Sequence, residues 1–259
     1  MEEIAASNTV DVSISVVSHL QIGLVTQLLA DLSAHGAGSR LEVILTLNLE
    51  ETLPFELNGF SFPVKLIRND SAKGFGANHN QAFRHASGRY FCVMNPDIRL
   101  DSNPFETLLA CLADASIGVV APLVLGENGE VEDSARRFPT PLTIMCKAFG
   151  RCKGTDYVIG NAPFHPDWVG GMCMLFPHAV FARLGGFDER YFLYYEDVDL
   201  CARLRLLGYE VLVNPQVKVT HHAQRTSRRS LTYLRWHFKS MLRFFLSPAC
   251  WRVHRLGRP

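Results

Sequence analysis

The sequence lacks an apolar run long enough to cross a membrane, since a spanning helix needs about 20 consecutive apolar residues. It begins Met1-Glu2-Glu3, without the basic stretch and apolar run that mark a secretory leader. Its seven cysteines are scattered, and no two have Cys-x-x-Cys spacing, which disfavours a disulfide scaffold or a zinc ribbon. These absences predict a protein of the reducing cytoplasm.

Two common phosphate-binding signatures are also missing. After the first strand-like segment the chain reads Ser18-His19-Leu20-Gln21-Ile22-Gly23, without the Gly-x-Gly-x-x-Gly that lets a backbone approach pyrophosphate. No Gly-x-x-x-x-Gly-Lys-Ser/Thr occurs either. Dinucleotide-dependent oxidoreductases and P-loop enzymes are therefore disfavoured.

Acidic residues are absent from the last part of the chain. Residues 211–259 contain ten Lys and Arg and no Asp or Glu, whereas residues 1–210 contain 16 basic and 25 acidic residues. The near-neutral total of +1 thus hides a basic tail. Such a tail favours an anionic partner, either nucleic acid or a membrane surface, although a solvated basic face has the same composition.

An amphipathic helix is predicted within this tail. Arg235, Lys239 and Arg243 follow one another at intervals of four on one face. Apolar residues at helical spacing form a stripe on another face: Leu231, Leu234, Phe238, Met241, Leu242 and Phe245. The pattern is typical of a helix in a membrane interface, and packing of the stripe on the body is the alternative. Aromatic residues among the arginines are also compatible with stacking on single-stranded nucleic acid.

The rest of the chain has the composition of a folded protein, with 47% apolar and 20% charged residues. Strand-like and helix-like segments alternate in its first half, which predicts an α/β fold with a mostly parallel sheet covered on both faces. The predicted strands are 12–17, 41–47, 64–67 and 90–94, and the predicted helices are 22–32, 76–86 and 104–113. Functional side chains are expected where these strands end.

The rhythm changes after residue 120. Residues 126–129 (Gly-Glu-Asn-Gly) predict a hairpin turn, and residues 137–168, with four of the 13 prolines, predict a long irregular excursion. The later predicted elements are a strand over 171–176, a helix over 196–207 that Gly208 ends, and short strands near Val211 and Val217.

Asp97 is a candidate ligand-binding residue. Asn95-Pro96-Asp97 follows the predicted strand 90–94, and Pro96 cannot continue a strand ladder. Asp97 is thus expected at the carboxyl end of a strand, where open α/β sheets bind ligands. A carboxylate there can hold a divalent cation and, through it, a nucleotide diphosphate. Asn-Pro-Asp is also ordinary turn composition.

A second acidic cluster, Glu196, Asp197 and Asp199, begins a predicted helix, where acids stabilise the helix dipole. Positions 196 and 199 share a face and 197 projects about 100° away, so Asp197 can face a pocket while the others stabilise the helix start. His221 leaves a later strand and is a candidate metal ligand.

In this order the motifs resemble the family 2 glycosyltransferases of the GT-A fold, in particular the rhamnosyltransferase-like branch. The resemblance covers roughly residues 10 to 227, and its most specific part is the pairing of Gly-Gly-Phe-Asp-Glu (185–189) with Glu-Asp-x-Asp-Leu (196–200). The other matching segments are Val16-Val17-Ser18, Gly74 to Ala82, Met94 to Asp97, Val169-Gly170-Gly171, Tyr191-Phe192 and Val219-Thr220-His221.

The resemblance implies a Rossmann-like GT-A domain over residues 1–227, with a donor half of about 10–100 and an acceptor half of about 101–227, followed by a basic amphipathic segment over 228–259. It assigns Asp197 as the catalytic base, and Asp97 and His221 as ligands of Mg²⁺ or Mn²⁺. The residues implied in donor binding are Val17, Ser18, Asn48, Glu50, Asn69, Gly74, Asn78, Asn80, Asn95 and Asp97. Those implied in acceptor binding are Trp168, Gly170, Gly171 and Glu196.

The implied reaction is inverting transfer of a sugar, with L-rhamnose as a candidate, from a dTDP- or UDP-linked donor to a saccharide or polyprenyl-linked saccharide in cell-surface polysaccharide synthesis. The implied location is the cytoplasm, at the cytoplasmic face of the inner membrane, with the tail on anionic lipid. The sequence departs from the family at Asn95, the first position of the usual Asp-x-Asp, and in residues 48–52, which lack the usual Asp-Asn-x-Ser-x-Asp. The alternative is a noncatalytic module that binds a nucleotide sugar or nucleic acid. The joint presence of Asp97, Asp197 and His221 favours the enzyme and makes nucleic acid the weaker partner.

Overall fold

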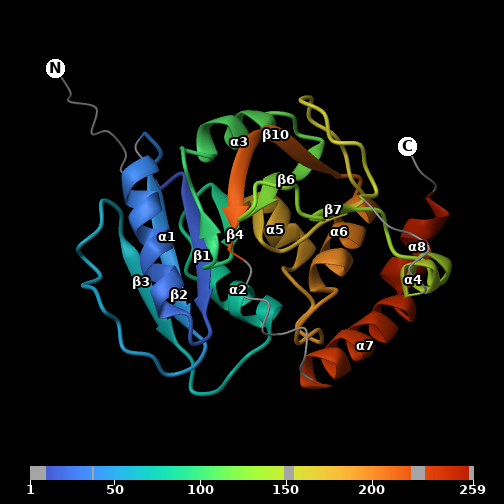
Figure 1. Cartoon of the computed structure of the whole chain (residues 1–259), viewed down its shortest axis with the longest axis horizontal. Helices are drawn as coiled ribbons and strands as arrows, with labels where there is room; N and C mark the ends of the chain where they lie inside the picture. The colour runs from blue at the N-terminus through green and yellow to red at the C-terminus, as the bar shows by residue number, and fades with distance from the viewer. Residues whose placement is uncertain (1–9, 37, 149–154, 223–230, 257–259) are drawn as a thin grey trace.

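The structure is a computed structural model that describes residues 10–36, 38–148, 155–222 and 231–256 (Figure 1). Its strands are β1 (Val12–Ser18), β2 (Leu41–Leu47), β3 (Val64–Arg68), β4 (Tyr90–Met94), β5 (Ile98–Arg99), β6 (Ile117–Gly126), β7 (Ala135–Arg136), β8 (Trp168–Val169), β9 (Cys173–Pro177) and β10 (Glu210–His221). Its helices are α1 (Ile22–His35), α2 (Phe75–Phe83), α3 (Phe105–Cys111), α4 (Pro141–Ala148), α5 (His178–Leu184), α6 (Glu196–Leu206), α7 (Leu231–Phe245) and α8 (Pro248–Arg255).

The described strands form one large sheet in the order β3-β2-β1-β4-β9-β6-β10-β5, and β7 pairs with β8 in a separate ribbon. The strands β3, β2, β1 and β4 are parallel to one another, as the alternation of strands and helices predicts. β9 is antiparallel to both β4 and β6, and β5 is antiparallel to β10. The first half of the sheet is therefore parallel and the second half mixed, because β9 is reached through a long excursion and not through a crossover helix.

Helices cover both faces of the sheet (Figure 1). On one face α1 and α3 pack on a core that includes Cys92 and Met94 of β4. On the other face α5 and α6 pack on a core that includes Phe91 and Val93, and α2 borders that core. Alternate residues of one strand thus serve two cores, which is the pattern of a sheet buried on both sides.

The second half of the chain departs from the predicted elements in several places. The two short strands expected near Val211 and Val217 are one strand, β10, with a register irregularity between Asn214 and Lys218. The helices α5 and α8 and the short strand β5 were not predicted, and the excursion over 137–168 contains α4. The turn over 126–129 is confirmed, with Gly129 at φ 75°.

The C-terminal helices pack on the body. Phe244 of α7 and two residues of α8, Cys250 and Val253, form a third apolar cluster with Tyr191 and with Val198 of α6. The predicted boundary at residues 227 and 228 lies outside the described residues, so the division there stays a prediction. No helix in the described ranges is both long enough and apolar enough to cross a membrane.

Of the cysteines in the described ranges, five are free thiols, among them Cys92, Cys173 and Cys201 in the cores. Cys146 of α4 is disulfide-bonded, a bond that the sequence did not predict.

Candidate active site

Asp97 lies where β4 gives way to β5 and is 9% exposed. Its Oδ2 lies 3.3 Å from His221 Nε2, at the end of β10, and its Oδ1 is buried without a hydrogen-bond partner. The structure thus brings together the two residues predicted as metal ligands, from strand ends that are about 120 residues apart in the sequence.

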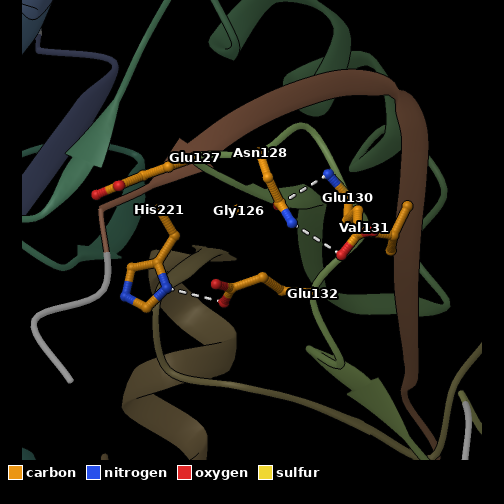
Figure 2. A pocket seen from close by; sticks show the side chains of 7 residues that line it. All are labelled: Gly126, Glu127, Asn128, Glu130, Val131, Glu132 and His221. Carbon is orange, nitrogen blue, oxygen red and sulfur yellow. Dashed lines mark hydrogen bonds and ion pairs between the residues drawn. The ribbon is translucent and has the colours of Figure 1, made fainter.

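His221 is held from its other side by a residue that the sequence did not single out. Its Nδ1 lies 2.8 Å from Glu132 Oε2, in the segment that follows the β6 turn (Figure 2). Asn128 and Glu130 of the same turn bond to each other and not to the histidine. A cavity of about 530 Å³ opens between this turn and His221. The sequence offered one weak signal for Glu132, because a hairpin turn over 126–129 folds the following residues back beside the preceding strand.

The charges around His221 set its protonation. Burial alone would lower the pKa of the imidazole, but hydrogen bonds and charge interactions with Asp97 and Glu132 outweigh it and raise the pKa to about 9. In the absence of a cation, His221 is therefore an imidazolium between two carboxylates. The bond to Glu132 also fixes the ring so that Nε2 points at Asp97.

Asp97 and His221 fit a divalent cation. Two neighbouring ligands of an octahedral ion with bonds of about 2.1 Å lie about 3 Å apart. The 3.3 Å between Asp97 Oδ2 and His221 Nε2 is close to that spacing, and the unpartnered Asp97 Oδ1 is a further oxygen ligand. Within the described ranges, no group of three or more His, Cys, Asp and Glu side chains is arranged to hold a metal ion. Oxygens of a bound diphosphate are the natural additional ligands, since Mg²⁺ is usually held by one or two carboxylates together with substrate phosphates.

Asp197 lies at the start of α6, and backbone N–H groups fix its carboxylate. Its Oδ2 accepts a hydrogen bond from Gly171 N at 3.1 Å, and its Oδ1 accepts one from Val198 N at 2.8 Å. Burial raises the pKa of Asp197, while these backbone bonds and the charge of Arg136 act in the opposite direction. The result is a carboxylate whose proton affinity is higher than usual, which is what a general base requires.

Glu196 differs from its neighbour Asp197. It is 5% exposed and its Oε2 has no hydrogen-bond partner. Burial, and then the charge of Asp197, raise the pKa of Glu196 well above its ordinary value. Because the two carboxyls interact, they titrate as a pair. The backbone bonds stabilise charge on Asp197, so Glu196 is the member that holds the proton and Asp197 is the one that ionises.

Asp199 stabilises the structure. It forms an ion pair with Arg203 one turn later in α6, at 2.7 Å. The guanidinium of Arg203 also donates to the carbonyls of Leu184 and Gly186, so the pair connects α6 to the glycine turn after α5. Of the three acids at the start of α6, Asp197 is the one that accepts a hydrogen bond from Gly171, which lies just before β9.

The backbone connects the two acidic sites. Asn95, two residues before Asp97, donates its N–H to Met172 O at 2.8 Å. Gly171, the residue before Met172, donates to Asp197. Asp97 and Asp197 are therefore supported by adjoining backbone at the same edge of the sheet, where β4 and β9 meet.

Glycine is required where the two halves of the chain touch. A Cβ on Gly74 would lie 2.6 Å from Phe192 O, and one on Gly171 would lie 2.9 Å from the Phe75 ring. Phe75 N donates to Phe192 O at 2.9 Å across this contact. The sequence placed Gly74 in donor binding and Gly171 in acceptor binding. Their visible role is to let the two halves of the site approach each other.

The residues that lead into α6 are strained. Tyr194 and Tyr195 have φ values of 69° and 66°, a left-handed conformation that costs a non-glycine residue about 1–3 kcal/mol. Such strain persists only where surrounding contacts hold it. It lies immediately before Glu196 and Asp197, at the point that orients the predicted base.

Three asparagines from the predicted donor site form one network. Asn69 Nδ2 donates to Asn48 Oδ1 at 3.0 Å and to Asn78 Oδ1 at 2.7 Å. Asn48 and Asn78 in turn bind the backbone of Lys73, and Asn78 also binds Gly74 O. The Oδ1 of Asn69 is buried without a partner. The network connects the ends of β2 and β3 to the start of α2, and Asn69 Oδ1 is an acceptor that remains open.

At the end of β1, Glu51 and not Glu50 forms the hydrogen bonds to the protein. Glu51 accepts hydrogen bonds from Ser18 Oγ at 2.7 Å and from the backbone N–H groups of Leu20 and Ile22, each at 2.9 Å, so it fixes the turn into α1. Glu50 is exposed, and Val17 is partly buried beside Ser18. The donor roles of Val17, Ser18 and Glu50 stay predictions.

Three further predicted residues are engaged in protein contacts. The amide of Asn80 accepts from Phe187 N at 2.8 Å and donates to Phe187 O at 2.9 Å, which anchors α2 to the glycine turn. Trp168 Nε1 donates to Arg137 O at 2.9 Å, and the Arg136 guanidinium lies over the Trp168 ring. Gly170 donates to Ser134 O at 2.8 Å. These bonds leave the ligand-binding roles of Asn80, Trp168 and Gly170 as predictions.

The comparison with protein families agrees with this geometry. The family model described as Glycosyl transferase family 2 matches residues 16–170, which include the end of β1, the asparagine network and Asp97. The chain belongs to glycosyl transferase family 2. The same fold occurs in the solved structure of GalNAc-T7 with UDP, GalNAc and Mn²⁺, with a TM-score of 0.66 at 15% identity over 91% of this chain and 48% of that one. The GT-A fold predicted from the motifs is confirmed.

Relatives of this family 2 chain include two rhamnosyltransferases. Rhamnosyltransferase WbbL of Escherichia coli K12 is 30% identical over 66% of this chain and 69% of its own length. The N-acetylglucosaminyl-diphospho-decaprenol L-rhamnosyltransferase of Mycobacterium tuberculosis is 32% identical over 57% of this chain and 52% of its own. The family 2 chain thus spans about half the length of the mycobacterial relative.

Proposed function

We propose that the protein is a cation-dependent, inverting glycosyltransferase that uses a nucleotide diphosphate sugar. The observation that supports this most strongly is the joining of two sites at one sheet edge. Asp97 and His221 lie 3.3 Å apart with an open carboxylate oxygen, and Asp197 is held by the backbone next to them. The first site suits a diphosphate leaving group, and the second suits an attacking hydroxyl.

The chemistry is a single displacement. The acceptor oxygen forms a bond to the anomeric carbon, the bond from that carbon to the diphosphate oxygen breaks with its electron pair, and the hydroxyl proton passes to Asp197. Asp197 is suited to this because its pKa is raised while backbone N–H groups keep its ionised form oriented. A divalent cation held by Asp97 and His221 supplies positive charge to the leaving diphosphate.

Glu196 supports the division of roles. As the neutral member of the pair it places no second negative charge beside Asp197, so the base can ionise without a like charge next to it. The Oε2 of Glu196 is buried and has no hydrogen-bond partner. The predicted role of the Glu196 side chain is to contact an acceptor hydroxyl.

The proposed substrates follow the relatives. A dTDP- or UDP-linked sugar, with L-rhamnose as the candidate, is the donor, and a saccharide or a polyprenyl-linked saccharide is the acceptor, because the mycobacterial relative is named for a decaprenol-linked substrate. We place the reaction in the cytoplasm, at the cytoplasmic face of the inner membrane, in cell-surface polysaccharide synthesis. Mg²⁺ and Mn²⁺ are both candidate cations.

A nucleotide panel tests the proposal. Thermal denaturation is followed with dTDP, UDP, GDP and ADP, each with Mn²⁺, with Mg²⁺ and with chelator, because a ligand stabilises the state that it binds. One nucleotide is expected to raise Tm only when the cation is present, and transfer from the matching sugar donor is then measured. Stabilisation without transfer to any acceptor would favour the noncatalytic nucleotide-sugar module. A panel with no cation-dependent stabilisation would refute the proposal.

A further inference from the structure

The helix α7 has an inner face that holds the segment leading to the predicted base. The Trp236 ring packs at a tilt against the Phe192 ring, with centroids 4.7 Å apart, and Ser240 Oγ donates to Leu193 O at 2.8 Å. Phe244 is fully buried, with its ring centroid 5.8 Å from that of Tyr195. Trp236, Ser240 and Phe244 are spaced by four, so they share one face of the helix.

His237 extends these contacts to the strained residues. Its ring centroid lies 5.3 Å from that of Tyr194 and 5.4 Å from that of Tyr195. Both tyrosines have positive φ values and directly precede Glu196 and Asp197. One side of α7 is thus in contact with the backbone that orients the predicted base.

The outer face of α7 is apolar and uncovered. Leu231, Leu234, Phe238 and Leu242 follow at intervals of three, four and four, and they are 84%, 65%, 60% and 49% exposed. The alternative that the whole stripe packs on the body is therefore wrong for these four. Three more exposed apolar residues follow along the chain: Leu246 between α7 and α8, Trp251 in α8, and Leu256 directly after α8. The four residues on α7 share one helix face, and an exposed apolar stripe of this kind marks an interaction site.

The charges around this face decide between possible occupants. The described residues of α7 and α8 include Arg235, Lys239, Arg252 and Arg255 and no acid, whereas Arg243 of α7 lies over the buried Tyr191 ring on the body side. A second copy of the chain would oppose this set with an equal positive set, which disfavours a self-complementary interface. Nucleic acid would satisfy the charges but would leave leucine side chains exposed. An anionic bilayer satisfies both, since lysine and arginine meet lipid headgroups while leucine and phenylalanine enter the acyl boundary.

We propose that the outer face of α7, defined by Leu231, Leu234, Phe238 and Leu242, docks on an anionic membrane and holds the segment that carries Asp197 next to the bilayer. A helix with its side chains is about 10 Å across, so residues 192–195 on the inner face lie about that far from the lipid headgroups. A lipid-linked saccharide acceptor would be anchored in the same bilayer surface. The lipid-linked acceptor rests on the proposed function. Docking of α7 on the membrane does not.

Vesicle cosedimentation of the full chain tests the docking. Wild type is mixed with vesicles of phosphatidylcholine alone and with vesicles containing phosphatidylglycerol, at low and at high salt. We expect binding to the anionic vesicles that weakens with salt. Leu234→Glu and Phe238→Glu should each lower the partition coefficient by about tenfold or more, since burial of such a side chain is worth at least that factor. The matched control is Val158→Glu, which adds the same charge at a residue that is 99% exposed outside the tail.

Several results would overturn the docking inference. One is equal partition of wild type and Phe238→Glu, and another is a loss in Val158→Glu as large as that in Phe238→Glu. A concentration-dependent dimer that Phe238→Glu abolishes, without any vesicle binding by wild type, would assign the face to a second copy. Binding to single-stranded RNA in preference to anionic vesicles would assign it to nucleic acid.

A transfer assay separates this inference from the proposed function. With a water-soluble short-chain acceptor, Phe238→Glu should retain wild-type turnover, whereas with the polyprenyl-linked acceptor in vesicles it should lose about tenfold, in proportion to its partition. Vesicle binding with no transfer to any acceptor would refute the enzyme and leave the docking intact. Equal turnover of wild type and Phe238→Glu on the vesicle-bound acceptor would overturn the positioning of Asp197 at the bilayer.

Discussion

Replacement of Asp197 by asparagine should abolish transfer while leaving the fold and donor binding in place. The substitution keeps the size of the side chain but removes the ionised oxygen that accepts the hydroxyl proton. General-base catalysis is worth about 10²–10⁴ in rate, or about 3–5 kcal/mol of transition-state stabilisation, so kcat should fall by at least 100-fold. The donor KM should change little, because Asp97 and His221 are untouched.

The structure also predicts that the variant remains folded. Asparagine can keep one backbone bond, to either Gly171 or Val198, and its amide nitrogen cannot accept the other. Loss of one such bond costs about 1 kcal/mol. Removal of an acid whose pKa is raised by burial offsets this at neutral pH, because the ionised form is the one that burial penalises. The melting temperature should therefore stay within a few degrees of wild type.

The pH profile supplies an independent check. Because Asp197 must be ionised to act, kcat/KM of wild type should fall as pH falls through its raised pKa, and this acid limb should be absent from the residual activity of Asp197→Asn. The assay measures initial rates of sugar transfer from pH 5 to 9. The control is Asp114→Asn, the same change in an exposed turn, which should keep wild-type rates. Less than about tenfold loss in Asp197→Asn would refute the assignment of the base.

Three further predictions follow from the same geometry. Asp97→Asn should remove the cation dependence of nucleotide binding, measured by calorimetric titration with and without Mn²⁺; an unchanged dependence would exclude Asp97 from the cation site. Glu132→Gln should weaken Mn²⁺ binding, measured by electron paramagnetic resonance, by about 10–100-fold through loss of the charged partner of His221, and an unchanged Kd would contradict that orienting role. Glu196→Gln should flatten the pH dependence of stability. The folded pKa of Glu196 is raised, so the native state binds more protons than the unfolded state above the ordinary pKa, and the wild-type free energy of unfolding falls as pH rises. Parallel urea-denaturation profiles of variant and wild type from pH 5 to 9 would contradict this.

Short buried strands were the easiest elements to predict. The bounds of β2 and β4 agree with the sequence because β2 is mostly apolar, β4 is a continuous apolar run, and each is followed by polar or turn residues. β10 was divided in two because Asn214-Pro215 reads as a turn. In the structure the strand continues past it with a local irregularity, which is a position where a sheet tolerates proline.

The sequence predicted the motif residues of the site but not the residues that form hydrogen bonds with them. Asp97, Asp197 and His221 could be found because each follows or begins a regular element. Glu132 is bound to His221 across 89 positions of sequence, and the turn before Glu132 places it beside β6 without indicating that partner. The same holds for Asn80, whose amide is taken by the backbone of Phe187, 107 positions away. Long-range hydrogen bonds are decided by the packed sheet and not by local pattern.

The orientation of α7 shows the limit of periodicity. The sequence indicated an apolar stripe but left both a membrane face and a core face open. In the structure Trp236, Ser240 and Phe244 form the inner face, although Ser240 is less apolar than the residues of the predicted stripe. Ser240 is inside because its hydroxyl satisfies the carbonyl of Leu193, a partner that the helix alone does not reveal.

The most direct test of the account is a crystal structure of Asp197→Asn bound to Mn²⁺ and its nucleotide diphosphate sugar. The account predicts the cation between Asp97, His221 and the diphosphate, with the anomeric carbon exposed toward the amide of residue 197 on the side opposite the leaving oxygen. A cation bound elsewhere, or an anomeric carbon with the leaving group and residue 197 on the same side, would contradict it.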